Sequence, residues 1–174
     1  MIDSLRSQGM RAATYTFTSV WRISACRERT WTFLESPDQQ WADWWPPLRS
    51  IHLHRTDQLL GSTASCRWRS LWGYVLGVDL EVVRVERGHR VDLAADGDLT
   101  GTGVVRFADG SDGTTEVTTQ WSVTTTPRWM QISSPVLWPM FRIGHYVVMR
   151  RGERGLERAL TRRRREWHGP SGRT

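Results

Sequence analysis

A chain of 174 residues falls within the usual size of one domain and can bury one apolar core, so we expect a single domain spanning residues 1–174. Its net charge of +6 arises at the C-terminal end, because residues 150–174 hold nine Arg and three Glu while the preceding residues are balanced. No apolar run of about eighteen residues and no apolar signal core occurs, which argues against a membrane-spanning helix and predicts a cytoplasmic protein.

The first predicted element is a strand over residues 13–25, where large apolar residues alternate with Thr and Arg. The apolar residues of its buried face are Tyr15, Phe17, Trp21 and Ile23. A short helix follows from about Cys26, with Ser24 as its expected cap, and breaks at Ser36 and Pro37. A second short helical segment, residues 37–45, ends where two prolines follow it.

Six further strands are predicted between residues 50 and 125, separated by short turns rich in Gly, Asp and Ser. They cover residues 51–55, 63–69, 74–86, 90–95, 100–108 and 115–125. Short turns of this kind join antiparallel neighbours. With the first strand they make a seven-stranded sheet, and a twisted sheet of that size is expected to curl.

A long helix is predicted from about residue 134 to residue 167, and we expect it to lie in the hollow of the curved sheet. Its apolar and small residues recur at spacings of three and four. They are Leu137, Phe141, Gly144, Val148, Gly152, Leu156, Ala159 and Leu160. Arginines take the intervening positions. The predicted fold class is therefore α+β, with residues 1–12 and 168–174 as flexible tails.

This order of elements resembles the helix-grip fold of the START-like, or SRPBCC, superfamily, which includes polyketide cyclase/dehydrase and lipid-transport proteins. Three local motifs are similar to those of the family. They are the aromatic segment Trp31, Phe33, Leu34, Trp41, Trp44, Trp45 and Pro46; Leu60-Gly61-Ser62; and Gly113-Thr114-Thr115-Glu116-Val117-Thr118. The resemblance implies a ligand cavity between the curved sheet and the C-terminal helix.

Eleven tryptophans are many for this length, and because Trp is seldom fully buried we expect several to face a cavity or solvent. Trp68 and Trp121 share strand faces with neighbouring apolar residues, and others lie beside predicted turns. The predicted ligand-binding residues are Trp44, Trp45, Trp68, Trp72, Trp121, Trp129, Phe141, His145 and Met149. The alternative is that these residues only pack the terminal helix against the sheet.

Three polar residues are candidates for catalysis: Tyr74, His145 and Tyr146. An imidazole at position 145, close to the apolar stripe, could orient a ligand oxygen or move a proton near neutral pH. The alternative is a hydrogen-bonded core histidine, because the sequence offers no second catalytic partner for it.

Metal and cofactor chemistry has little support. Cys26 and Cys66 form no CxxC pair, so we expect reduced thiols and no zinc site. His52 and His54 share one strand face, but no third ligand is spaced to join them, which favours a solvated outer face. No GxSxG, HExxH, phosphate-binding glycine loop or EF-hand pattern occurs. We expect no cofactor and no metal.

Three functions remain open. The first is binding of a hydrophobic or aromatic small molecule, such as a lipid, a polyketide or an isoprenoid-like compound. The alternative is a polyketide cyclase/dehydrase-like enzyme, in which polar wall residues steer ring closure. The weaker alternative is an interaction module that contacts an acidic surface through Arg162, Arg163, Arg164 and Arg165. DNA binding is not expected, and a homodimer is left open.

Overall fold

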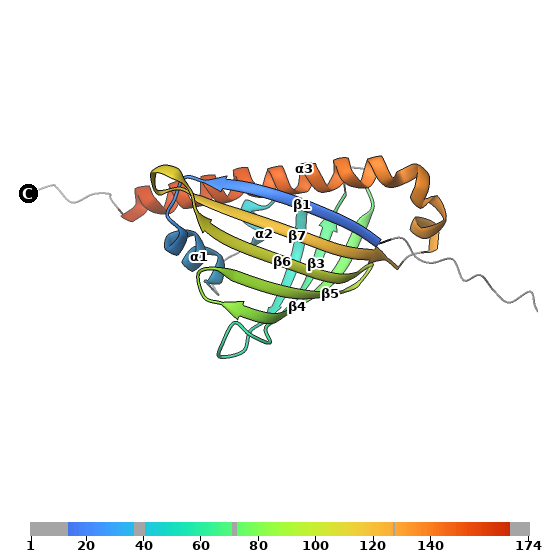
Figure 1. Cartoon of the computed structure of the whole chain (residues 1–174), viewed down its shortest axis with the longest axis horizontal. Coiled ribbons are helices and arrows are strands. Elements are labelled where there is room, and N and C mark those ends of the chain that lie inside the picture. Colours follow the sequence, from blue (N-terminus) through green and yellow to red (C-terminus); the bar gives the residue numbers. More distant parts are fainter. Residues whose placement is uncertain (1–13, 37–40, 71–72, 127, 168–174) are drawn as a thin grey trace, which may run out of the picture.

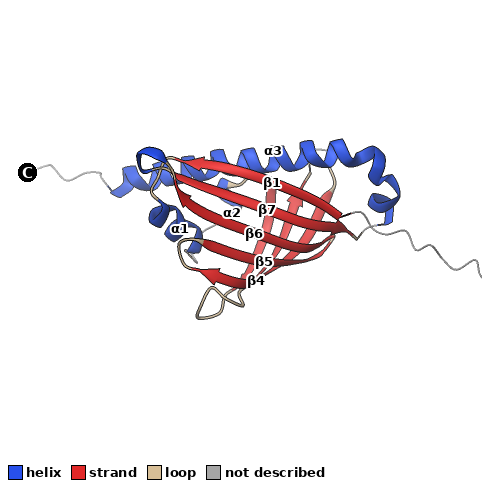
Figure 2. Cartoon of the chain, viewed as in Figure 1, coloured by secondary structure: helices blue, strands red, loops and turns tan. Residues whose placement is uncertain are grey.

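Seven antiparallel strands form one curved sheet, and a long C-terminal helix runs along it (Figure 1). The computed structural model describes residues 14–36, 41–70, 73–126 and 128–167, and within the last range it describes side chains for residues 139–163. Strands and helices are separated in Figure 2, where the sheet and the helix above it form two layers. This confirms the predicted fold class.

The strand order is β1-β7-β6-β5-β4-β3-β2, so β2 to β7 form a meander and β1 pairs with β7 at one edge of the sheet. The bounds are β1 (Thr14–Ile23), β2 (Leu48–His54), β3 (Thr63–Arg69), β4 (Val75–Glu86), β5 (Arg90–Gly97), β6 (Leu99–Asp109) and β7 (Thr115–Thr125). The predicted bounds of the third and last strands are confirmed. The second strand begins earlier than predicted, at Leu48, directly after the two prolines.

The helices are α1 (Arg27–Glu35), α2 (Trp41–Trp44) and α3 (Arg128–Trp167), with a 3₁₀ turn at Ser111–Gly113. The prediction that Ser24 caps α1 is wrong, because Cys26 occupies the N-cap position and makes no side-chain cap. The backbone N–H of Ser24 instead donates to the Glu157 carboxylate of α3. The terminal helix also begins earlier than predicted, at Arg128.

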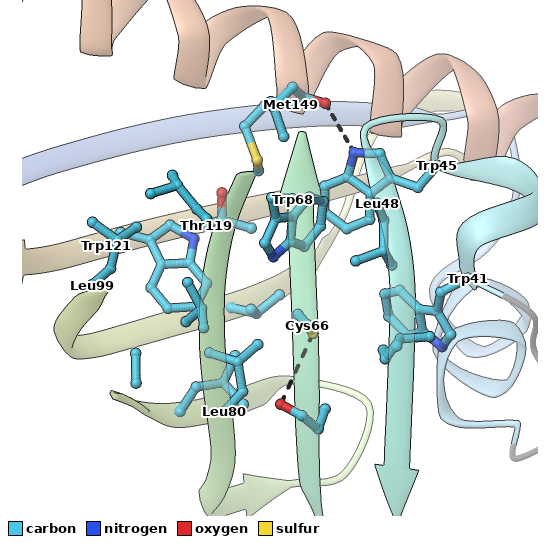
Figure 3. A pocket seen from close by; sticks show the side chains of 18 of the residues that line it. Trp41, Trp45, Leu48, Cys66, Trp68, Leu80, Leu99, Thr119, Trp121 and Met149 are labelled. Atoms are coloured by element: carbon cyan, nitrogen blue, oxygen red, sulfur yellow. Dashed lines mark hydrogen bonds between the residues drawn. The ribbon is translucent and has the colours of Figure 1, made fainter. Parts of the chain in front are cut away.

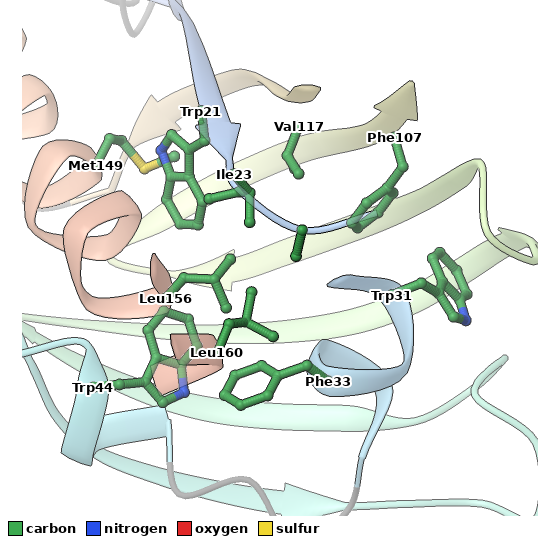
Figure 4. Close-up of a cluster of buried hydrophobic side chains, with 11 residues drawn as sticks. Trp21, Ile23, Trp31, Phe33, Trp44, Phe107, Val117, Met149, Leu156 and Leu160 are labelled. Carbon is green, nitrogen blue, oxygen red and sulfur yellow. The ribbon is translucent and has the colours of Figure 1, made fainter. Parts of the chain in front are cut away.

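From Phe141 onward the apolar stripe of α3 faces inward, as its spacing predicts, and its two halves contact different parts of the fold. The side chain of Leu137 lies outside the described residues. Leu156 and Leu160 are buried in the core cluster (Figure 4), and Gly152 is also buried. That cluster also contains Trp31 and Phe33 of α1. Its other members come from β1, the residues just after β1, α2, β6, β7 and α3: Trp21, Ile23, Ala25, Trp44, Phe107, Val117 and Met149. The preceding turns of α3 lie over a cavity instead.

Polar side chains of α3 fix it to the free edge of the sheet. An edge strand leaves a row of backbone N–H groups without strand partners. The N–H of Arg22 on β1 donates to the Glu153 Oε1 at 3.0 Å. Just after β1, the N–H of Ser24 donates to Glu157, which lies four residues further along the helix. The Glu153 carboxylate is only 7% exposed and also accepts from Arg150. The helix therefore both covers the edge and positions its own N-terminal half above the sheet.

Candidate ligand-binding cavity

A cavity of about 420 Å³ lies between the concave face of the sheet and α3. Small-molecule sites commonly fall between roughly 300 and 1,000 Å³, so this volume suits a ligand of several rings or a long chain. Figure 3 shows Trp41 and Trp45 on the α2 side, Trp121 on the opposite side, and Met149 above them.

The wall is built by period-two alternation on the central strands, because successive side chains of a strand point to opposite faces. Alternate residues of β3, β4 and β7 therefore line the cavity while their neighbours face outward. The lining residues of these strands include Ala64, Cys66, Trp68, Leu76, Val78, Leu80, Val82, Val117, Thr119, Trp121 and Val123. Phe141, Gly144, His145, Val148 and Met149 of α3 complete it from above.

A cluster of indoles holds α2 against both the sheet and the helix. Trp45 donates its Nε1–H to the carbonyl of Val148 at 2.9 Å. Its ring packs edge-on against Trp68 at 4.7 Å and against Trp21 at 5.3 Å between centroids. A Cβ at Gly152 would lie 2.6 Å from the Trp45 ring, so only glycine allows this approach. The end of the cavity near α2 is therefore closely packed and aromatic.

Trp121 faces the cavity because the neighbouring strand makes room for its ring. Gly103 of β6 is its partner in the strand register. A Cβ at Gly103 would approach the Trp121 ring to 2.4 Å, so the indole lies over bare backbone. Any larger residue at this position would push the indole further into the cavity.

His145 lies on the wall with two partners from β1. Its ring stacks on Phe17 at 4.6 Å between centroids, and its Nε2 lies 3.0 Å from the Ser19 hydroxyl. Burial lowers the pKa of His145 to about 4, because the charged imidazolium loses its hydration there. The imidazole is therefore neutral at pH 7 and can act as a hydrogen-bonding group or proton acceptor, while the cationic acid form is absent.

Two further titratable groups of the wall keep their protons. Burial raises the pKa of the Tyr74 phenol, with a smaller opposing effect from its hydrogen bond to Ser70. Burial, with a smaller effect of Asp79, raises the pKa of the Cys66 thiol to about 12. At neutral pH the phenol is a hydrogen-bond donor and the thiol is not a nucleophile. His145, Tyr74 and Cys66 are thus neutral at pH 7, while the acidic and basic residues Glu35, Arg55 and Arg69 also line the wall.

Two buried polar atoms of the wall have no hydrogen-bond partner among the described residues: the Thr119 hydroxyl and the Trp21 indole N–H. Both side chains are more than nine-tenths buried. Thr119 pairs with Ser19 and Trp21 with Val117 in the β1–β7 register, so the two side chains are diagonal neighbours on one face. A ligand oxygen placed between them would satisfy groups that are otherwise costly to bury.

The structure brings most of the predicted residues to the cavity, but not all of them. The residues on the wall are Trp45, Trp68, Tyr74, Trp121, Phe141, His145 and Met149. Trp44 instead lies in the core cluster beside Phe33, and Tyr146 is 63% exposed. Trp72 and Trp129 lie outside the residues whose side chains the structure describes. The roles of all these residues stay predictions.

Several wall residues were not among the predicted ligand contacts, although a signal for them existed. Tyr15, Phe17 and Trp21 line the cavity from β1, and the alternation of residues 13–25 predicted only that this face is buried. Ser19 belongs to the same face, and its contact with His145 joins residues 126 positions apart. That contact depends on how α3 crosses the sheet edge, which no local pattern encodes.

The described part of the chain contains no group of three or more His, Cys, Asp or Glu side chains placed to hold a metal ion. None of its helices combines the length and apolar character needed to cross a membrane. In the basic run, Arg162 is exposed, and the Arg163 guanidinium lies 5.1 Å from the Phe33 ring centroid. The side chains of Arg164 and Arg165 lie outside the described residues.

The sequence matches no protein-family profile and no curated protein, but solved structures share its architecture. The Zhui aromatase/cyclase from Streptomyces sp. R1128 has a TM-score of 0.72 at 11% identity, over 91% of this chain and all of that one. The di-domain ARO/CYC BexL from the BE-7585A biosynthetic pathway has a TM-score of 0.63 at 18% identity, over 83% of this chain and 49% of that one. Ara h 8.0201 has a TM-score of 0.55 at 12% identity, over 86% of this chain and 99% of that one. The protein therefore has the helix-grip fold that these solved structures share.

Proposed function

We propose that the protein binds a hydrophobic or aromatic small molecule in the cavity between the sheet and α3. The observation that carries this proposal is a cavity of about 420 Å³ whose wall is aliphatic and aromatic almost throughout. Apolar burial contributes roughly 25 cal/mol per Å², so a ligand of matching shape gains most of its affinity without any charged contact.

A neutral fluorescent probe, N-phenyl-1-naphthylamine, tests the proposal in combination with two matched variants. Ala64 of β3 lines the cavity, and its neighbour Ser65 is exposed on the opposite face of the sheet. Ala64→Phe fills part of the cavity, while Ser65→Phe places the same side chain in solvent on the same strand. We expect Ala64→Phe to weaken probe binding at least tenfold and Ser65→Phe to leave it unchanged.

The circular dichroism spectrum of each variant shows whether the fold is retained. Absence of probe binding to the unsubstituted protein, or equal binding by a folded Ala64→Phe variant, would contradict the proposal. If Ala64→Phe does not fold, Leu80→Trp provides the same obstruction from β4, since Leu80 also lines the cavity.

A second function is supported by a separate observation: hydrogen-bonding side chains that are neutral at pH 7 lie among the apolar residues of the wall. The pair of Ser19 and His145, with Tyr74 elsewhere on the wall, could orient the oxygens of a polyketide chain and accept a proton during ring closure. Similarity to the Zhui and BexL aromatase/cyclases supports a polyketide cyclase/dehydrase-like enzyme.

Product analysis separates this enzyme from a carrier. A poly-β-ketone chain would be incubated with the protein and with His145→Ala, and cyclised products would be compared with those of the uncatalysed reaction. The enzyme hypothesis predicts altered cyclisation that the variant loses while it still binds N-phenyl-1-naphthylamine. Identical product mixtures with and without protein would leave only ligand binding.

A further inference from the structure

A smaller cleft of about 210 Å³ adjoins the main cavity. It lies where the segment between α2 and β2 and the end of β3 approach α3. Its lining residues are Pro46, Pro47, Arg49, Arg69, Ser70, Gly144, Val147, Val148 and Arg151. Arg69, Ser70, Gly144 and Val148 also line the main cavity, so the two spaces meet at these residues.

Three arginines from three different elements line this cleft. Arg49 comes from β2, Arg69 from the end of β3 and Arg151 from α3. No Asp or Glu lines it, and none of the ion pairs between described residues includes any of the three. By contrast, Arg90 is paired with Asp92 on β5 and Arg84 with Glu86 on β4. Three cations are thus gathered without a compensating carboxylate.

The junction between cleft and cavity is open at Gly144. A Cβ built at this position would meet no atom within 4 Å, which contrasts with the tight approaches at Gly152 and Gly155 of the same helix. Close packing of α3 therefore does not require glycine here, and its lack of a side chain leaves space between the apolar cavity and the arginines. An elongated molecule could occupy both spaces at once.

We propose that the ligand is an amphipathic anion, with its apolar body in the cavity and a carboxylate, phosphate or sulfonate group in the cleft between Arg49, Arg69 and Arg151. This inference rests on the proposed binding function and narrows its ligand class. Guanidinium groups are well suited to such anions because their planar N–H donors bind two oxygens at once. Because the three side chains are exposed, their effect is screened by salt.

Two probes that share one ring system separate the apolar and anionic parts of this proposal. N-phenyl-1-naphthylamine is neutral, and 8-anilinonaphthalene-1-sulfonate adds a sulfonate to the same rings. The test variant is the double substitution Arg49→Gln and Arg151→Gln, because both residues line the cleft and neither lines the main cavity. The control is Arg67→Gln with Arg154→Gln, which removes the same charge from the neighbouring strand β3 and the same helix at exposed residues outside both spaces.

We expect the test variant to weaken sulfonate binding about tenfold and to change neutral-probe binding by less than twofold. The control variant should bind both probes as the unsubstituted protein does. Raising the salt concentration should weaken sulfonate binding more strongly in the unsubstituted protein than in the test variant, which keeps Arg69 alone of the three. Equal loss of sulfonate affinity in test and control variants would overturn the inference.

The two probes also distinguish failure of the proposed binding function from failure of the anionic ligand class. If the neutral probe fails to bind, the proposed function itself is contradicted. If the neutral probe binds but the affinity for the sulfonate probe does not depend on the arginines, only the anionic ligand class is refuted. Competition by dodecanoate and by dodecyl phosphate then identifies the preferred head group. Displacement by at least one of them, weakened in the test variant, supports the inference, and displacement by neither contradicts it.

Discussion

Gly155 and Gly144 lie on one helix, yet the structure predicts opposite effects when each becomes alanine. At Gly155 a Cβ would lie 1.7 Å from the carbonyl oxygen and 2.8 Å from the carbonyl carbon of Trp44. At Gly144 a Cβ would meet nothing within 4 Å. The substitution adds one methyl group in both cases, so any difference reports on how closely α2 approaches α3.

The size of the effect follows from the contact distances. A carbon and an oxygen atom need somewhat more than 3 Å, so α2 must move by well over 1 Å and disturb the packing of Trp44 and Trp45. Overpacking of this kind costs about 1–3 kcal/mol, and contact with backbone places Gly155→Ala at the upper end. The higher helix propensity of alanine stabilises the helix by up to about 1 kcal/mol relative to glycine and offsets part of this cost. At Gly144, where no overpacking occurs, this stabilisation is the whole expected effect.

Urea unfolding followed by tryptophan fluorescence measures both variants. We expect Gly155→Ala to lower the free energy of unfolding by about 2 kcal/mol and Gly144→Ala to raise it by up to about 1 kcal/mol. Equal stabilisation of both variants would refute the inferred contact between α2 and α3.

Three further predictions concern buried polar groups. Burial lowers the pKa of His145 to about 4 in the folded protein, whereas in the unfolded chain the imidazole takes up its proton near pH 6.5. The free energy of unfolding should therefore be at its full value above about pH 6.5. It should fall by at most about 3 kcal/mol as the pH decreases toward 4. Urea unfolding across this pH range should show a smaller decline for His145→Gln, and an unchanged decline would contradict the assigned burial. Glu153→Ala leaves the edge N–H of Arg22 without its acceptor and should cost about 1–3 kcal/mol in the same assay, more than Glu157→Ala, whose contact is exposed. A thiol reagent at pH 8 should modify exposed Cys26 rapidly and Cys66 only after unfolding, because Cys66 is buried and its pKa is raised to about 12. Rapid modification of both cysteines in the folded protein would be inconsistent with this prediction.

Period-two and helical patterns were sufficient to predict the sheet and the inward stripe of α3. The alternation of β7 placed Thr119 and Trp121 on one face, and the cavity indeed lies on that side. Both patterns are local, and each reports which face of an element is apolar. They do not report whether that apolar face meets another side chain or an empty space.

The placements that local patterns did not predict arise where long-range contacts decide the environment. Trp44 ends α2 and Trp45 follows it directly, yet Trp44 enters the core and Trp45 reaches the cavity, because this segment lies against Gly152 and Gly155. Tyr146 follows His145 directly, but the helix turns it into solvent. The cap expected at Ser24 is absent, since the edge of β1 is bonded by α3 instead.

The central claim is that an apolar molecule enters the space between the sheet and α3, and NMR of methyl-labelled methionine tests this directly. Met149 lines the cavity and is 6% exposed, whereas Met140 of the same helix does not line it. On addition of N-phenyl-1-naphthylamine, we predict intermolecular nuclear Overhauser effects from the probe to the Met149 methyl group and none to that of Met140. Binding of the probe without any such effect at Met149 would contradict the account.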